Sequence, residues 1–336
     1  MSEHNGGLSR REFLKRLGIL TAGVGVATHV SPLFAKRADR ELFSPARNST
    51  AERSRSTRGV RHTAATGQAD LVGVRNARPE EMFDAGIAAL GGMSRFVSRG
   101  QRVCIKPNVS WNIDPDRGAT TDPRLVARIV EHCLEAGASR VYVVDHTIDT
   151  WHLAYKATGM EQYVKGAGAR LVPGNSESLY QEVTVPGGRN LKSTQVHEVV
   201  LESDVLINVP ILKDHGSTGI TAALKNLMGL VWNRWYYHGH GLNQCIADFP
   251  RFRAPDLNVV DAHVVMTDGG PRGSGHRSNL VEKKMQILSP DIVAADTAAA
   301  QTFGTRPDRI RHIPLAEAHG LGTMDLDSLR VRRIDL

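Results

Sequence analysis

From about Asp70 onward, short apolar segments alternate with amphipathic ones, and this alternation limits the fold more than any other feature. Residues 141–144 and 205–209 have the length and composition of buried strands. The clearest helix is capped by Asp122, begins at Pro123 and is stopped by Gly137. Strands that alternate with helices are typical of a mostly parallel sheet. We therefore predict an α/β domain over residues 70–336, a mostly parallel sheet flanked by helices with an elaborated second half.

The same pattern assigns the individual elements. The predicted strands are 71–74, 102–106, 141–144, a short one at 171, 183–185, 196–201, 205–209, 257–261, 285–288 and 329–334. The predicted helices are 79–90, 123–136, 150–168 with glycine breaks, 221–228, 243–248, 290–303 with Ser289 as its cap, and one near Leu315.

The N-terminus has the form of a twin-arginine export signal. An apolar stretch, 17–30, follows the basic residues and is short for a bilayer span. The signal residues are Ser9, Arg10, Arg11, Glu12, Phe13, Leu14 and Lys15. Ala35 suits a cleavage site, whereas Leu33 does not. We predict a signal over 1–35, export through the twin-arginine translocase and a periplasmic location, with a membrane anchor if the signal is not cleaved; the alternative is a chance basic pair before an amphipathic helix.

The net charge of +7 belongs to the N-terminal part of the chain. Residues 1–61 hold 12 of the 42 Lys and Arg but only 5 of the 35 Asp and Glu, which leaves 30 of each in the rest. The stretch 36–69 is rich in Arg, Ser, Thr and Ala without helical or strand periodicity, so we predict a flexible basic linker. A balanced domain argues against a nucleic-acid binder.

The spacing of the cysteines limits which cofactors the chain itself can hold. Cys104, Cys133 and Cys245 are isolated in sequence and form no CxxC pair. This argues against an iron–sulfur cluster of the chain's own, and the positions of Cys104 and Cys133 predict buried thiols. No GxSxG elbow is present, which argues against a Ser/His/Asp hydrolase of that type.

Ionisable residues follow four predicted strands directly, where open α/β sheets bind ligands. We expect these strand ends to line one cleft. Lysines there would hold a phosphate or carboxylate, while Asp and His would ligate a divalent metal or move protons. The predicted catalytic residues are Lys106, Lys213, His215 and Lys225. The predicted substrate-binding residues are Asn108, Thr121, Asn226 and Gly270. The predicted metal ligands are Asp145, His146, Asp261 and Asp268.

Each of these residues also has a structural interpretation. A lysine at a strand end is usually solvated. Asp145 with His146, and likewise Asp214 with His215, can cap a following helix. Asp261 and Asp268 can serve as turn formers before a glycine-rich loop. The aromatic segment 231–241 fits a lid over the cleft, a partner surface or a plain core cluster.

Several segments together resemble the family called domain of unknown function 362, over roughly Asp70 to the C-terminus. The first group that carries the resemblance is Ile105–Asn108, Thr121–Pro123, Gly137, Ala138 and Val143–Asp145. The second group is Leu206–Pro210, Leu212, Lys213, His215 and Leu224–Gly229.

The resemblance implies an α/β fold and little settled function. Many relatives look like ferredoxin fusions, and this chain departs from them by lacking the cluster cysteines. A further similarity in fold to the nickel-dependent lactate racemase group brings a cofactor-dependent enzyme into consideration. Two functions remain open. The first is an exported cofactor- or metal-dependent enzyme for a small anionic substrate. The second is a non-catalytic periplasmic ligand- or metal-binding or maturation protein that serves a redox partner protein.

Overall fold

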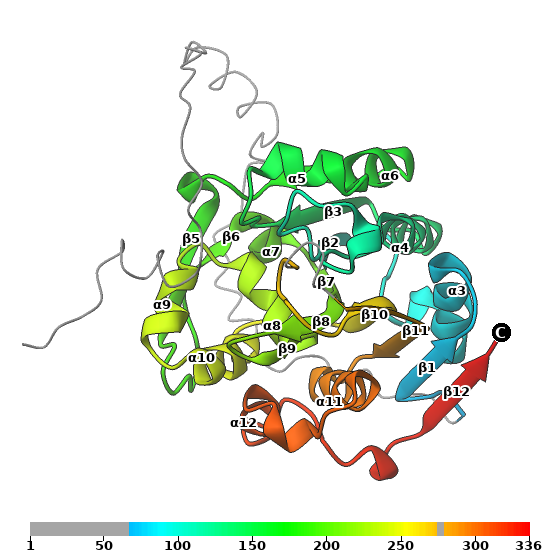
Figure 1. Ribbon diagram of the computed structural model, residues 1–336. Coiled ribbons are helices and arrows are strands. Elements are labelled where there is room, and N and C mark those ends of the chain that lie inside the picture. The colour runs from blue at the N-terminus through cyan, green and yellow to red at the C-terminus, as the bar shows by residue number, and fades with distance from the viewer. Residues whose placement is uncertain (1–66, 274–278) are drawn as a thin grey trace, which may run out of the picture. The chain divides into compact units, whose positions relative to one another are not determined.

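A mixed sheet of ten strands forms the core of residues 67–273 and 279–336, which the computed structural model describes. The predicted signal, and the predicted linker up to residue 66, lie outside these residues. Along the sheet the order is β12 (Val331–Asp335), β1 (Leu71–Arg75), β11 (Leu280–Ser289), β10 (Leu257–Met266), β7 (Val205–Val209), β2 (Arg102–Pro107), β3 (Arg140–Asp145) and β4 (Arg170–Pro173) (Figure 1). The predicted α/β class is confirmed.

The parallel half of the sheet sets the position of the site. β7, β2, β3 and β4 are parallel neighbours, and β10 continues the parallel run beside β7. Their carboxyl ends therefore meet at one edge. β11 is antiparallel to both β10 and β1, which makes the sheet mixed. β8 (Ile211–His215) leaves β7 after Pro210 and pairs with β10, and β9 (Gly219–Thr221) pairs with β8.

Helices cover both faces of the sheet (Figure 1). One face packs against α3 (Pro79–Ala89), α4 (Pro123–Glu135), α5 (Trp151–Ala157) and α6 (Met160–Gly166). The other packs against α8 (Ala223–Asn226), α10 (Leu242–Asp248), α11 (Ile292–Phe303) and α12 (His312–Glu317). In β2, Val103 and Ile105 join the first core and Cys104 the second, as the alternation of a strand requires. The predicted buried thiols of Cys104 and Cys133 are confirmed.

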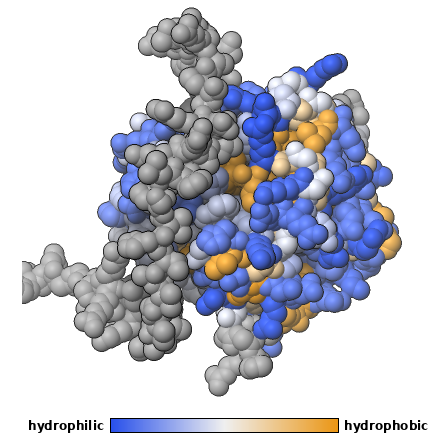
Figure 2. All heavy atoms as spheres, turned by 90° about the horizontal axis from the view of Figure 1, so that it is seen from above, coloured by the Kyte–Doolittle hydropathy of each residue, from blue (hydrophilic) through white to orange (hydrophobic). Residues whose placement is uncertain are grey.

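The second half is elaborated, as predicted. A separate two-stranded sheet, β5 (Tyr180–Thr184) with β6 (Ser193–His197), precedes the short helix α7 (Glu198–Glu202). Another short helix, α9 (Arg234–Gly239), follows the turn after α8. No helix in the described residues has the length and apolar character needed to cross a membrane. The face seen in Figure 2 is mostly hydrophilic where it is not grey, with hydrophobic residues in small groups.

Three element predictions were wrong in detail. The predicted strand 196–201 stops at His197, whose Nδ1 accepts a hydrogen bond from the Val199 amide and starts α7. The predicted helix 221–228 begins only at Ala223, because Thr221 still pairs in β9. The cap of α11 is Asp291 instead of Ser289.

Asp291 holds the N-terminus of α11. Its Oδ1 accepts hydrogen bonds from the Val293 and Ala294 amides at 2.9 and 2.8 Å, and its Oδ2 accepts one from the Thr323 amide at 3.0 Å. Ser289 instead donates to the Asp70 carbonyl. The carboxylate therefore ties the helix start to the segment before β12.

We predict that Asp291→Ala lowers the free energy of unfolding by about 1–2 kcal/mol, because helix amides lose their acceptor. Urea denaturation followed by circular dichroism measures the change. Asp327→Ala, which removes an exposed carboxylate elsewhere, is the control and should leave the midpoint unchanged. Equal midpoints for the two variants would contradict the role of Asp291.

Candidate functional site

A buried ion pair joins the carboxyl ends of β2 and β3. Lys106 Nζ lies 2.9 Å from Asp145 Oδ1, and each side chain is 1% exposed. The strands are parallel neighbours, so the pairing of Ile105 with Val143 places the two residues on adjacent strand ends. Asp145 Oδ2 also accepts a hydrogen bond from the Val109 amide at 2.7 Å. The alternative in which Asp145 caps the following helix is therefore wrong, since its carboxylate belongs to the ion pair and Thr150 precedes α5 as its N-cap residue.

Asn226, the last residue of α8, connects the ion pair to its surroundings. Its Oδ1 accepts hydrogen bonds from Lys106 Nζ and from Asn108 Nδ2, both at 3.2 Å. Its Nδ2 donates to the Lys106 carbonyl at 3.1 Å and to Asn208 Oδ1 at 2.9 Å. Asn208 in turn donates to Asn258 Oδ1 at 3.0 Å. A row of buried amides thus fixes the strand ends relative to α8.

Thr121 has a structural position. Its Oγ1 accepts a hydrogen bond from the Asn108 amide at 2.8 Å and donates to the Val209 carbonyl at 2.7 Å. Both hydrogen bonds hold the loop before α4 against β7 and the end of β2. The side chain is 0% exposed, so the structure gives Thr121 a bracing role where the sequence predicted substrate binding.

Two further lysines extend the positive charge. Lys213 on β8 is 1% exposed and its Nζ donates to the Ala119 carbonyl. Burial, together with the charges of Lys225 and Lys106, lowers the pKa of Lys213 to about 7. Burial and the charges of Arg234 and Lys106 lower the pKa of Lys225 to about 8. Lys225 makes no hydrogen bond or ion pair within the described part of the chain.

Arg234 completes what we call the cationic cluster, defined as Lys106, Lys213, Lys225 and Arg234, and His215 and His238 lie near it. Arg234 donates to the carbonyls of His146 and Thr147 at 2.8 and 3.1 Å, and burial lowers its pKa. Burial and the nearby Lys225 and Lys213 lower the pKa of His215 to about 2, so this imidazole is neutral at pH 7. Burial, Lys225 and Arg234 also lower the pKa of His238. Four cationic side chains therefore gather around the single ion-paired carboxylate of Asp145.

Gly229 packs directly against the ion pair. A Cβ atom at this position would lie 2.1 Å from Asp145 Oδ1 and 2.5 Å from Lys106 Cε. Its carbonyl accepts a hydrogen bond from the His146 amide at 2.9 Å. Only glycine fits here without displacing the charged groups.

Gly270 makes a second close backbone approach. Its amide donates to Asp214 Oδ2 at 2.9 Å, and a Cβ atom would lie 1.9 Å from the Asp214 carbonyl oxygen. The loop after β10 is thereby attached to β8 next to Lys213. The amide of Gly270 is occupied by this carboxylate, so the structure gives it a loop-anchoring role.

The four predicted metal ligands are not brought together. Asp145 is ion-paired with Lys106, and Asp268 is exposed on the loop after β10. His146 stacks on Trp232 with ring centroids 4.9 Å apart, and its Nδ1 lies 3.0 Å from the Val231 carbonyl oxygen. Asp261 lines a separate cavity. Across residues 67–273 and 279–336, no group of three or more His, Cys, Asp or Glu side chains is placed to hold a metal ion.

The aromatic segment 231–241 divides between core and surface. Tyr237 is 0% exposed and joins the core beside α10, whereas Trp235 is 58% exposed. Trp232 stacks on His146 next to the ion pair. The core interpretation holds for Tyr237, and Trp235 keeps the surface interpretation open.

Sequence reasoning missed four residues that shape this site: Asn208, Gly229, Arg234 and Asn258. The sequence pattern around one of them indicates a role in the site. Asn208 interrupts an otherwise apolar strand, and a buried amide needs partners that only a second polar side chain supplies. Gly229 ends a segment that carries the family resemblance, but no local pattern gave Gly229 or Arg234 a role in the site, because their roles depend on α8 and α9 folding back onto the strand ends.

The fold and site define an α/β protein with a buried cationic cluster at the carboxyl edge of its sheet. The profile of the family described as Domain of unknown function (DUF362) matches residues 103–301, and the chain belongs to this family. That match contains every member of the cationic cluster. The resemblance seen in the sequence is thereby confirmed.

Two known proteins are similar to the chain. A thylakoid-associated protein of Synechocystis sp. is 27% identical over 251 residues, which cover 69% of this chain and 72% of that protein. The lactate racemase apoprotein from Thermoanaerobacterium thermosaccharolyticum is 13% identical with a TM-score of 0.41. That match covers 66% of this chain and 55% of the racemase.

We predict that Gly229→Ala lowers the free energy of unfolding by about 1–3 kcal/mol, because the added methyl group displaces a packed ion pair. Gly216→Ala is the matched control, since a Cβ there meets no atom within 4 Å. Chemical denaturation of both variants measures the difference. A Gly229→Ala protein as stable as the control would show that the ion pair is not packed as described.

We predict that Lys106→Met and Asp145→Asn each cost about 3–5 kcal/mol of stability, because each leaves a buried partner uncompensated. The double variant should lose clearly less than the two single losses together. Denaturation of all four proteins closes this double-mutant cycle. Strictly additive losses would contradict a direct interaction between the two side chains.

Proposed function

We propose that the protein binds a small anionic ligand, a carboxylate or phosphate, at the cationic cluster and acts on it as an enzyme. The observation that carries the proposal is the charge imbalance: four cationic groups, three of them lysines, surround one ion-paired carboxylate. Mutual repulsion and burial raise the free energy of these cationic groups when no anion is bound. A bound anion would offset that cost.

Lys225 is the side chain best suited to contact the ligand. It is only partly exposed and has no partner within the described residues, so its ammonium group is available as a point charge. Asn108 supports the same interpretation. Its Oδ1 is buried without a hydrogen-bond partner in the described part of the chain, and a hydroxyl or protonated group of a ligand would satisfy it.

Lys213 is the group best suited to move a proton. Its pKa of about 7 places it near the range where a general acid or base works at neutral pH. His215 stays neutral there and accepts a hydrogen bond from the Ser217 amide, so it orients the turn after β8. Lys106 is held in its ion pair and fixes the geometry of the site.

We also propose export. The twin-arginine pattern at Ser9–Lys15 predicts a protein that crosses the membrane already folded, which suits one that acquires its ligand or cofactor inside the cell. The relative named as thylakoid-associated accords with a location at a membrane.

An unchanged ligand recovered from the purified protein, with no turnover, would favour the carrier function over the enzyme.

We predict that the protein binds one malonate ion and that its affinity falls at least ten-fold between pH 6 and pH 9. The sign follows from the lysines: below pH 7 both Lys213 and Lys225 carry a proton, and above pH 8 both have lost it. The charge of malonate changes little in this range. Titration calorimetry at fixed ionic strength measures the affinity.

Lys225→Met should lower the malonate affinity at pH 6 at least ten-fold, because the ammonium group is lost. Lys156→Met, which changes an exposed lysine on α5, is the matched control and should bind as the unchanged protein does. Binding that is independent of pH, or equal in both variants, would overturn the proposal. Inorganic phosphate serves as the second probe and separates phosphate from carboxylate preference.

A further inference from the structure

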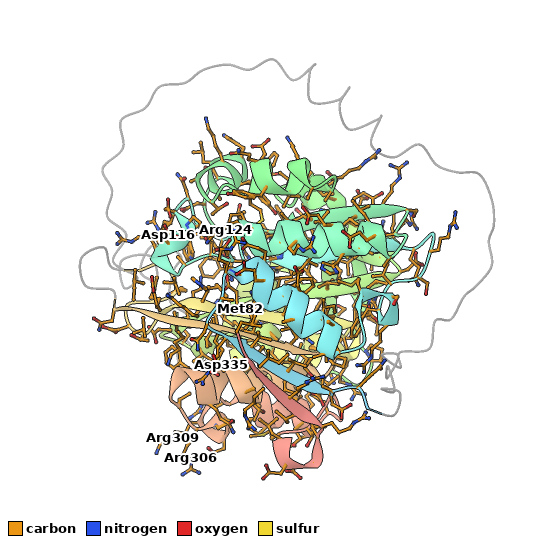
Figure 3. The ribbon with its side chains drawn as sticks, turned by 90° about the vertical axis from the view of Figure 1, so that its right-hand side faces the viewer. Met82, Asp116, Arg124, Arg306, Arg309 and Asp335 are labelled. Carbon is orange, nitrogen blue, oxygen red and sulfur yellow. The ribbon has the colours of Figure 1, made fainter. Side chains whose placement is uncertain are left out.

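A cavity of about 420 Å³ lies beside the N-terminal end of α4, separate from the cationic cluster. The loop 119–122 divides the two: the Ala119 carbonyl accepts from Lys213, whereas Thr120 and Asp122 line the cavity. Figure 3 shows two of its polar residues, Asp116 and Arg124, near the same end of α4. This volume suits a small organic molecule.

The cavity is acidic after its internal ion pair is counted. Arg124 Nη2 lies 2.6 Å from Asp122 Oδ2, so these two charges compensate each other. The remaining carboxyl groups on the lining are Asp116, Asp261 and Glu282. Glu282 Oε2 lies 3.7 Å from Lys284 Nζ, and both of these side chains are exposed to solvent. The potential inside the cavity therefore favours a positive charge.

The carboxyl group of Asp261 is buried in the wall of the cavity. It is 1% exposed; its Oδ2 accepts from the Asp122 amide at 2.9 Å and its Oδ1 from the His263 amide at 3.0 Å. Burial and the nearby Asp122 raise its pKa to about 7, against an opposing effect of Arg124. Burial lowers the pKa of the His263 imidazole, which is therefore neutral at pH 7.

Thr120 supplies an independent sign of a ligand. It lines the cavity and is 1% exposed, and its Oγ1 is buried with no hydrogen-bond partner in the described residues. A buried hydroxyl without a partner costs free energy, and such groups in native proteins point to a missing water, ion or ligand. The apolar part of the lining, Ile211, Val264 and Leu280, suits a hydrocarbon body.

We propose that this cavity binds a small organic cation, a protonated primary amine on a short aliphatic chain, with its ammonium group between Asp261 and Thr120. The apolar wall covers the aliphatic chain, and Asp116 and Glu282 at the rim attract a second positive end. A bare metal ion fits less well, because no metal-ligating group of three side chains exists in the part of the chain that the structure describes.

The test is titration calorimetry of the full chain with putrescine at pH 8, where Asp261 is ionised. We expect one site. Asp261→Asn should weaken binding at least ten-fold, and Thr120→Val at least three-fold. Asp327→Asn, the same charge change on exposed surface, should bind as the unchanged protein does. Thermal melts verify that each variant is folded. If Asp261→Asn is unstable, Thr120→Val still tests the site, because valine keeps the shape of the threonine side chain.

The outcomes separate the ligand classes. Butanol, which has the same aliphatic body without the charge, should not compete with putrescine. Competition by Mg²⁺ alone at equal concentration would overturn the proposal in favour of a metal site. Absence of putrescine binding, or binding by Thr120→Val and Asp261→Asn as tight as that of the unchanged protein, would also overturn it. Malonate binding at the cationic cluster is measured separately, so either site can fail without the other.

Discussion

The ion pair between Lys106 and Asp145 is the interaction on which the carboxyl edge of the sheet depends. Two charges with 1% exposure are stable only with each other and with the hydrogen bonds around them. Asn226 and the Val109 amide supply those hydrogen bonds, and Gly229 leaves the space they need. The pair therefore fixes β2, β3 and the α8 segment in one arrangement. Lys213 and Lys225 are then held close to the fixed charge of Lys106, which helps to lower their pKa values.

Much of this fold was predictable from local patterns. The apolar strands, the Asp122 cap of α4 and the convergence of Lys106, Asp145 and Lys213 at one sheet edge follow from periodicity and from the geometry of parallel strands. The details that failed depend on tertiary context. His197 ends a strand because its own ring caps α7. The four predicted metal ligands do not come together within the described residues, because Asp145 pairs with Lys106, which lies 39 positions earlier in the chain.

Two sites of opposite charge lie on either side of the loop 119–122. Lys213 holds the Ala119 carbonyl on one side, and the Asp122 amide donates to Asp261 on the other. Thr121 between them braces the loop against β2 and β7. The hydrogen bonds of Ala119, Thr121 and Asp122 hold this loop between the two environments, in which a buried carboxyl group and a buried lysine each have a pKa of about 7.

Nuclear magnetic resonance titration of the lysine side chains, with and without malonate, tests directly whether the cationic cluster binds anions. We expect one lysine, assigned to Lys225 by its loss in Lys225→Met, to titrate near pH 8 in the free protein. Its pKa should rise when malonate binds, because the anion favours the charged ammonium. A Lys225 that titrates near its ordinary value of 10.5, unchanged by malonate, would contradict a cationic cluster that binds anions.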